Sequence, residues 1–251
     1  MWRFVCQSVR GGCHRSDGSV CQDYGVVRFI GDGASGALVA CIADGAGTAS
    51  LSDVGARTAC ESIIKCALRH LESHRTLATL QPADLIKWCE KIRNLLTRMA
   101  EQGQHLLRDY ASTLCVAVLS ARRSLFLQIG DGAIVVRRHG VCGAIFWPQS
   151  GEYLNTTSFL TSDDFRAQVQ VRAVEVPFAD AALLTDGVER LALQFDQRVP
   201  HLPFFQPLFA GVRAAGNVEV LGADLKGLLE SPAVAAKNDD DKTLLLACRI
   251  G

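Results

Sequence analysis

Apolar runs that begin or end at an aspartate recur along the chain, and they constrain its fold more than any other feature. Asp44, Asp131 and Asp186 follow the runs LVACIA, LFLQIG and LLT, and each precedes a glycine. Asp23 and Asp240 precede the runs YGVVRFI and KTLLLA. Runs of this length and composition predict buried strands. A following glycine lets a ligand approach the backbone closely. The pattern predicts packed strands with carboxylates gathered at their ends.

Carboxylates gathered without matching basic residues are unfavourable unless a cation neutralises them. Oxygen ligands suit Mg²⁺ or Mn²⁺. A single Asp-Gly pair is more often only a turn, as we expect for Asp32 in GDGAS. The repetition after apolar runs, together with the acidic triplet 239–241, favours a metal site.

The remaining pattern predicts an α+β fold with two antiparallel sheets and helices outside them, in a single domain over 1–251. Ser52 or Asp53 is expected to cap the first long helix. The second is expected over 82–108, and 200–231 reads as mainly helical. Residues 11–23 read as a loop, and the polar segment 148–165 as a flap. The expected strands are 2–10, 24–30, 37–43, three within 111–140, 167–175, 180–185 and 243–249.

Composition narrows the possible partners and compartment. Lys plus Arg and Asp plus Glu number 26 each, so no bulk field favours nucleic acid or a membrane surface. No apolar stretch approaches the roughly 20 residues of a membrane helix. The 10 cysteines include no C-x-x-C pair, which indicates buried thiols in a reducing, cytoplasmic setting. We expect a cytoplasmic monomer that binds neither nucleic acid nor membranes.

Five short motifs in fixed order resemble the metal-dependent protein phosphatases, the protein phosphatase 2C or PPM family, and most closely its bacterial stand-alone branch. The motifs are CQD (21–23), ADGAG (43–47), GDG (130–132), TDGVER (185–190) and DDKT (240–243). The resemblance implies a four-layer α/β/β/α sandwich. It also implies hydrolysis of phosphoserine and phosphothreonine with two Mg²⁺ or Mn²⁺ ions.

The resemblance also implies a role for each matching residue. Asp44 resembles the carboxylate that bridges both ions, and the Gly45 carbonyl resembles a ligand of the second ion. Asp186 and Asp240 resemble the other ligands of the first ion. Asp23 resembles the acidic residue of the first motif, and Asp131 resembles a ligand of a possible third ion.

Three positions depart from the family pattern. Gln22 stands where many members have Glu, which removes a charge near the second ion. Ala46 stands where many eukaryotic members have a histidine proposed as general acid, and Gly18 replaces a phosphate-binding arginine. His14 and Arg15 lie in the same loop, where they can substitute as general acid and phosphate ligand. His14 can equally be a loop histidine without a role.

Other acidic residues and cysteines have plainer interpretations. Asp241 stands where the family usually has Asn, and we expect Asp239 to be solvated. We expect Asp163 and Asp164 at the surface. Cys66, His70 and His74 share a helix face, but they lack an evident fourth zinc ligand. No cysteine is followed by Arg six positions later, so the loop of cysteine phosphatases is absent.

Three functions remain open on the sequence. The first is an active serine/threonine phosphatase that acts on a phosphoprotein and opposes a bacterial kinase. The second is a catalytically weak regulatory or binding module, which Gln22 and Ala46 suggest and the retained Asp44, Asp186 and Asp240 oppose. The third is a small-molecule phosphatase that uses the same site.

Overall fold

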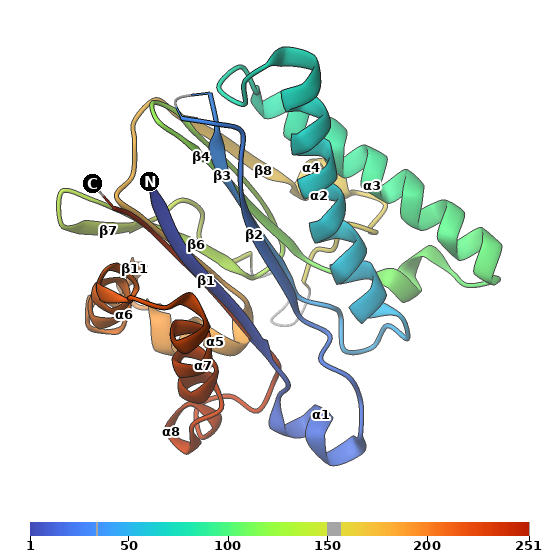
Figure 1. Ribbon diagram of the computed structural model, residues 1–251. Coiled ribbons are helices and arrows are strands. Elements are labelled where there is room, and N and C mark those ends of the chain that lie inside the picture. Colours follow the sequence, from blue (N-terminus) through green and yellow to red (C-terminus); the bar gives the residue numbers. More distant parts are fainter. Residues whose placement is uncertain (34, 150–156, 251) are drawn as a thin grey trace.

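Two five-stranded sheets lie face to face in the computed structural model, which describes residues 1–33, 35–149 and 157–250 (Figure 1). Every pairing within them is antiparallel. The first sheet has the order β1 (Trp2–Val9), β12 (Lys242–Arg249), β9 (Asp180–Leu184), β6 (Ala133–Arg138), β7 (Val141–Ala144). The second has the order β2 (Tyr24–Ile30), β3 (Ala37–Ala43), β4 (Leu114–Ser120), β5 (Ser124–Ile129), β8 (Gln170–Val174).

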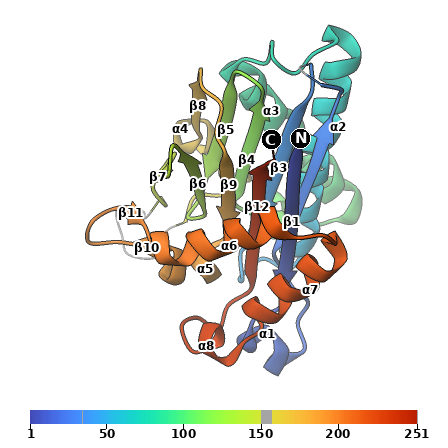
Figure 2. The ribbon, with the colours of Figure 1, turned by 60° about the vertical axis from the view of Figure 1, so that its left-hand side comes forward.

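Helices cover the outer face of each sheet, which confirms the predicted four-layer α/β/β/α sandwich (Figures 1 and 2). The second sheet is covered by α2 (Ser52–His74) and α3 (Pro82–Gly103), and the first by α5 (Asp186–Ala192), α6 (Leu202–Ala214) and α7 (Val218–Leu229). Shorter elements are α1 (Gly12–Asp17), η1 (Leu107–Tyr110), α4 (Phe165–Gln168), α8 (Pro232–Ala235) and the pair β10 (Leu193–Gln194) and β11 (Val199–Pro200).

Strand β3 shows how the layers follow from the sequence. Leu38, Ala40 and Ile42 face the other sheet, whereas Val39 and Cys41 face the helices. Because both faces of the strand are buried, its sequence is continuously apolar rather than alternating. This burial anchors the carboxyl end of the strand, where Asp44 follows.

Two helix boundaries differ from the sequence prediction. The helix α3 ends at Gly103 rather than near 108, because Gln104 has a left-handed backbone with φ of 57°. The residue before α2 is Leu51, and no side chain caps that helix. Ser52 and Asp53 are therefore its first helical residues, and neither is a cap.

Three short helices were not predicted from the sequence. The helix α1 lies within the predicted loop 11–23, α4 overlaps the start of the predicted strand 167–175, and α5 begins directly after β9. Helices of four to seven residues contain too few apolar positions to show a helical period. Asp32 lies in the β2–β3 turn, where its carbonyl accepts hydrogen bonds from the amides of Ser35 and Gly36.

All 10 cysteines are free thiols, and most of them are buried, as predicted. Within the described part of the chain, no helix has the length and apolar character needed to span a membrane. Residues 150–156 of the predicted flap lie outside the described residues.

Candidate metal and catalytic site

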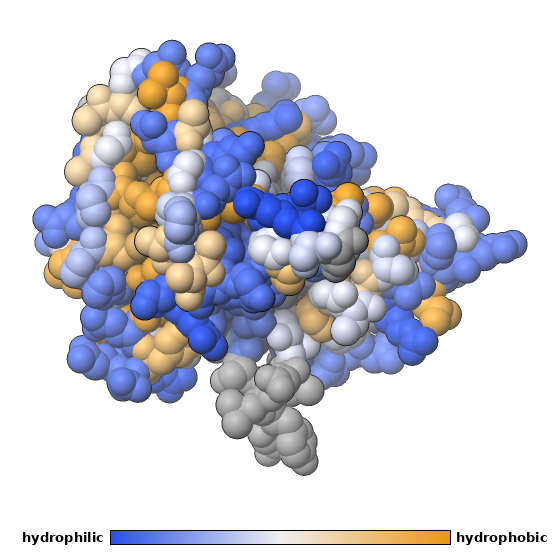
Figure 3. Space-filling model, turned by 90° about the horizontal axis from the view of Figure 1, so that it is seen from below, coloured by the Kyte–Doolittle hydropathy of each residue, from blue (hydrophilic) through white to orange (hydrophobic). Residues whose placement is uncertain are grey.

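Four of the predicted aspartates surround one cavity at the end of the sandwich where β3, β5 and β9 end and β12 begins. Asp44 follows β3, Asp131 lies between β5 and β6, Asp186 follows β9, and Asp240 precedes β12. Together they line a cavity of about 130 Å³. The end of the molecule that carries these strand ends is strongly hydrophilic near its centre (Figure 3). The other lining residues are Gly45, Ala46, Gly47, Thr113, Thr157 and Phe159.

The loop after β3 is fixed against the residue that precedes β4. The Asp44 amide donates to Thr113 Oγ1 at 3.0 Å, and the Thr113 amide donates to the Asp44 carbonyl at 2.8 Å. A Cβ on Gly45 would lie only 2.8 Å from the Gln22 carbonyl oxygen. Glycine is therefore required for the first-motif loop to pack against Gly45.

The loop after β9 depends on a second close approach. Asp186 is the first residue of α5, and Gly187 follows it, packed against the acidic triplet that precedes β12. A Cβ on Gly187 would lie 1.9 Å from the Asp241 carbonyl oxygen. The glycine thus lets Asp186 and Asp240 reach the same cavity.

The electrostatics of the cavity are those of an uncompensated acidic site. Burial, and then Asp23 and Asp186, raise the pKa of Asp44 well above its usual range. Burial raises the pKa of Asp186 to about 6, against a hydrogen bond with Asp44 that lowers it. Burial also raises the pKa of Asp131. Neither Lys nor Arg is among the described lining residues.

Unsatisfied oxygens support a cation at this site. Oδ1 of Asp131 and Oδ1 of Asp186 are buried and accept no hydrogen bond from the described residues. A buried acceptor without a partner costs free energy, which a hard cation recovers by coordination. The donor set therefore fits Mg²⁺ or Mn²⁺. That Asp44, Asp186, Asp240 and the Gly45 carbonyl are the ligands stays a prediction.

Asp23 is placed behind the cavity rather than on its wall. Its side chain is 5% exposed, and Oδ2 accepts a hydrogen bond of 2.7 Å from Thr185 Oγ1. Thr185 Oγ1 in turn accepts one of 2.9 Å from the Thr243 amide. Burial raises the pKa of Asp23 to about 8, although the hydrogen bond from Thr185 lowers it. Oδ1 has no hydrogen-bond partner among the described residues.

The three carboxylates of the acidic triplet have different environments. Asp240 lines the cavity, and Asp239 is exposed, as expected. Asp241 is only 2% exposed and acts as a latch. Its Oδ1 accepts from the Gly11 amide and its Oδ2 from the Gln22 amide, both at 2.6 Å. Asp241 thereby holds both ends of the segment that contains α1.

The helix α1 carries His14 and Arg15 beside the cavity, and neither is among its lining residues. His14 Nδ1 lies 3.0 Å from Asp241 Oδ1. Arg15 Nη2 lies 3.3 Å from Glu230 Oε1, in an exposed ion pair. Their roles as general acid and phosphate ligand stay predictions.

Two residues near the cavity were not singled out from the sequence. Thr157 Oγ1 donates to Asp131 Oδ2 at 2.6 Å and so orients that carboxylate. Burial, and then Asp186 and Asp131, raise the pKa of Glu189 to about 7. Glu189 stands three positions after Asp186 on α5, and this spacing places both side chains on one helix face. That spacing in the sequence could have identified Glu189 as a neighbour of the site. Thr157 has no such local signal.

The surface interpretations of the other candidates agree with the structure. Asp163 and Asp164 are exposed, and Asp163 Oδ1 lies 3.0 Å from Arg93 Nη2. His70 stacks on His74, with ring centroids 4.1 Å apart. Among the described His, Cys, Asp and Glu side chains, Cys13, His14 and Asp240 lie close enough together to hold a metal ion. No such group of described residues includes Cys66 on α2.

The family model described as "Protein phosphatase 2C" matches residues 10–230. The chain belongs to this family. As a protein phosphatase 2C it is a protein phosphatase, which confirms the predicted enzyme class. It is 34% identical over 252 residues to serine/threonine-protein phosphatase 3 of Escherichia coli K12, with 98% of each chain covered.

Solved structures resemble the fold over its whole length. Serine/threonine phosphatase Stp1 from Staphylococcus aureus has a TM-score of 0.66 at 15% identity, covering 100% of this chain and 96% of that one. The catalytic domain of the phosphatase PstP, solved with two manganese ions, has a TM-score of 0.66 at 16% identity, covering 100% and 99%. At such identities these likenesses confirm the sandwich fold.

Proposed function

We propose that the chain is a serine/threonine protein phosphatase that works with two Mg²⁺ or Mn²⁺ ions. The observation that carries this proposal is the small cavity where four carboxylates meet without a basic side chain in its described wall. The Escherichia coli relative is named as a serine/threonine phosphatase, and PstP is described with two manganese ions. Both descriptions agree with the donor set of this chain.

Each residue of the site has a stated task in this proposal. Asp44 would hold both ions, the Gly45 carbonyl the second, and Asp186 and Asp240 the first. Asp23 would support the second ion, and Asp131, oriented by Thr157, would hold a third. When bound, such ions supply an acidified water and neutralise charge on the phosphoryl oxygens.

The chain's own residues must first release protons. Burial and the neighbouring carboxylates raise the pKa values of Asp44 and Asp186, so each keeps its proton to a higher pH than a solvated carboxyl does. Both carboxyls must lose that proton before they can serve as anionic ligands. Cation binding at this site therefore competes with protons.

A larger cleft beside the cavity gives the substrate peptide a place to lie. It measures about 820 Å³, and it shares Ala46 and Phe159 with the wall of the cavity. Arg108 also lines the cleft and places a cation there, in a chain that lacks the usual phosphate-binding arginine at Gly18. A side chain that carries a phosphate can thus enter the cavity while its backbone occupies the cleft.

The decisive experiment is hydrolysis of a phosphothreonine peptide and of p-nitrophenyl phosphate, with Mg²⁺ and Mn²⁺ in separate series. We expect activity that EDTA removes and that Asp44→Asn or Asp240→Asn abolishes in folded protein. Asp239→Asn is the matched control from the same acidic triplet, and it should keep full activity. Activity retained in both ligand variants contradicts the proposal.

The alternative of a catalytically weak binding module is motivated by the first motif. Gln22 Oε1 is buried without a described hydrogen-bond partner, and Ala46 in the cavity wall has no proton to donate. Folded protein that binds Mn²⁺ and hydrolyses neither substrate at millimolar Mn²⁺ favours this alternative. Activity on small phosphate esters but on no phosphopeptide favours a small-molecule phosphatase. Under the main proposal, a serine/threonine kinase supplies the phosphoprotein substrate.

A further inference from the structure

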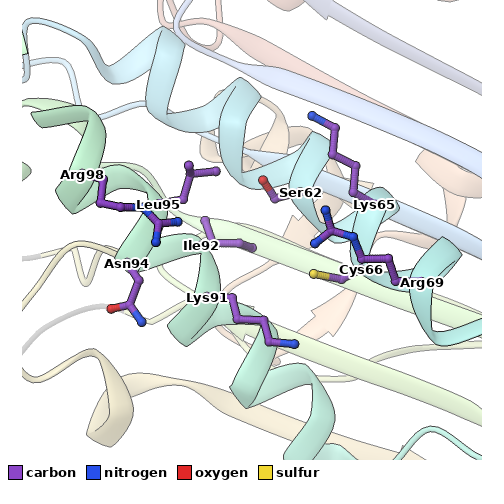
Figure 4. A pocket seen from close by; sticks show the side chains of 9 residues that line it. All are labelled: Ser62, Lys65, Cys66, Arg69, Lys91, Ile92, Asn94, Leu95 and Arg98. Carbon is purple, nitrogen blue, oxygen red and sulfur yellow. The ribbon is translucent and has the colours of Figure 1, made fainter. Parts of the chain in front are cut away.

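A groove between α2 and α3 gathers basic side chains on the outer helical layer. It has a volume of about 430 Å³, and its floor includes Ile92 and Leu95. Four exposed cations line it: Lys65, Arg69, Lys91 and Arg98. In Figure 4, Arg69 from α2 and Arg98 from α3 extend toward each other across the groove. A formally neutral chain thus carries a local excess of positive charge here.

These four cations lack acidic partners within the described structure. No ion pair involves any of them, and no described residue that lines the groove is acidic. Other basic residues on α3 are paired. Lys87 lies 3.8 Å from Asp84, and Arg93 lies 3.0 Å from Asp163. The positive charge is therefore unpaired in the groove, whereas Lys87 and Arg93 elsewhere on α3 have acidic partners.

The groove continues toward the start of α3. A second hollow of about 230 Å³ shares Arg69 and Lys91 with it and extends to Asp84. The stretch from Asp84 to Arg98 spans about 20 Å at 1.5 Å per helical residue. An extended peptide of about six residues covers that length.

We propose that this groove binds an acidic segment of the phosphoprotein substrate at a distance from the phosphorylated residue. The proposal rests on the proposed phosphatase function. The unpaired cations attract carboxylates, and the apolar floor of Ile92 and Leu95 accepts the aliphatic or aromatic residues that a peptide interleaves with them. A polyphosphate has no apolar group that could contact Ile92 and Leu95.

The position of the groove fixes the spacing between the acidic segment and the phosphorylated residue. Ser52 begins α2 directly against Gly45 of the metal cavity, because a Cβ on Gly45 would lie 2.8 Å from Ser52 Cβ. The α2 residues of the groove lie between Ser62 and Arg69, about 15–25 Å further along that helix. An extended chain crosses this distance with about five to eight residues.

Two phosphothreonine peptides test the proposal in the Mn²⁺-loaded enzyme. One carries four glutamates about eight residues from the phosphothreonine, and the other carries four glutamines there. The variant is Arg69→Glu/Arg98→Glu. We expect it to raise KM for the glutamate peptide about 10-fold at low salt, with kcat unchanged. KM for the glutamine peptide and activity on p-nitrophenyl phosphate should stay at wild-type values.

The matched control reverses the same charge on the opposite side of the sandwich. Arg138→Glu/Lys226→Glu alters two exposed residues of β6 and α7, and it should leave KM for both peptides unchanged. Arg69→Lys/Arg98→Lys should restore most of the affinity. Equal KM values for the two peptides in the wild-type enzyme overturn the proposal, as does an equal rise in KM from the control variant.

A binding measurement separates this inference from the proposed catalysis. A labelled, unphosphorylated acidic peptide should bind the metal-free protein, with loss of binding in Arg69→Glu/Arg98→Glu. If the protein binds this peptide but has no phosphatase activity, the proposed function is wrong. The inference that the groove binds acidic peptides then still holds. Tighter binding of a single-stranded oligonucleotide of equal charge, lost in the same variant, identifies a general polyanion site and rejects the peptide.

Discussion

Asp241 Oδ2 accepts a hydrogen bond of 2.6 Å from the backbone amide of Gln22, which ties the start of the last strand to the loop before Asp23. Oδ1 of the same carboxylate accepts one of 2.6 Å from the Gly11 amide. One buried side chain therefore closes both ends of the segment that contains α1. The carboxylate has a structural task, while its neighbour Asp240 faces the metal cavity.

Asp241→Ala should destabilise the protein by about 2–5 kcal/mol, because two buried amides lose their acceptor. Asp241→Asn keeps one acceptor oxygen and should cost about half as much. Asp239→Ala, at the exposed neighbour, should change stability by less than about 0.5 kcal/mol. Urea unfolding in saturating Mn²⁺ measures all three variants. Equal stability of Asp241→Ala and Asp239→Ala contradicts the latch.

Gly187→Ala should be strongly destabilising, by about 3 kcal/mol or more, because its Cβ would lie 1.9 Å from the Asp241 carbonyl oxygen. The helix α5 must then move away from the acidic triplet, so Mn²⁺ affinity should fall as well. Gly227→Ala in α7 is the control, since nothing lies within 4 Å of its added Cβ. It should stabilise the helix by about 0.5–1 kcal/mol. Thermal unfolding with and without Mn²⁺ distinguishes the two variants.

The sequence predicted the gathered aspartates and every strand of the two large sheets except β7, because these features depend on short patterns. Strand β3 is apolar on both faces, and Asp44 follows it directly. One short stretch of sequence therefore predicts both the buried strand and the carboxylate at its end. The same holds for Asp186 after β9. Close-packed glycines such as Gly45 are visible as Asp-Gly pairs, although the sequence does not show which backbone they approach.

Features that depend on distant segments could not be read from the sequence. The latch at Asp241 involves amides at Gly11 and Gln22, more than 200 positions away. The hydrogen bond from Thr157 to Asp131 joins residues 26 positions apart. The basic groove requires α2 and α3 to lie side by side, so its four cations appear in the sequence only as ordinary helix-surface charges.

Metal-free protein should become less stable as pH rises from about 4 to about 8. The pKa of Asp186 is raised to about 6 and that of Asp23 to about 8, from 3.8. Within this window the folded chain holds protons that the unfolded chain has lost, so the free energy of unfolding falls with rising pH. Saturating Mn²⁺ replaces those protons, and its stabilising effect should grow from pH 6 to pH 8.

Thermal midpoints at pH 5–8, in EDTA and in Mn²⁺, check both trends. Asp23→Asn should flatten the metal-free curve between pH 6 and pH 8, because it removes a carboxyl whose pKa is raised to about 8. A metal-free midpoint that rises steadily across this range is inconsistent with the protonated carboxyls.

Thr185→Val should weaken Mn²⁺ activation through Asp23. Thr185 Oγ1 donates to Asp23 Oδ2 at 2.7 Å, and this bond lowers the pKa of a carboxyl that burial raises. Without it, the pKa of Asp23 rises further and less carboxylate is available near pH 7. The loss also leaves the Thr243 amide without its acceptor, at a cost of about 1–3 kcal/mol.

The Mn²⁺ concentration for half-maximal activity, measured from pH 6 to pH 9, tests this link. In Thr185→Val the curve should shift to higher pH, and Thr185→Ser, which keeps the hydroxyl, should follow the wild type. A purely structural role lowers stability in Thr185→Val without moving the pH at which Mn²⁺ activates. An unshifted curve in folded Thr185→Val would show that Asp23 does not take part in holding the activating ion.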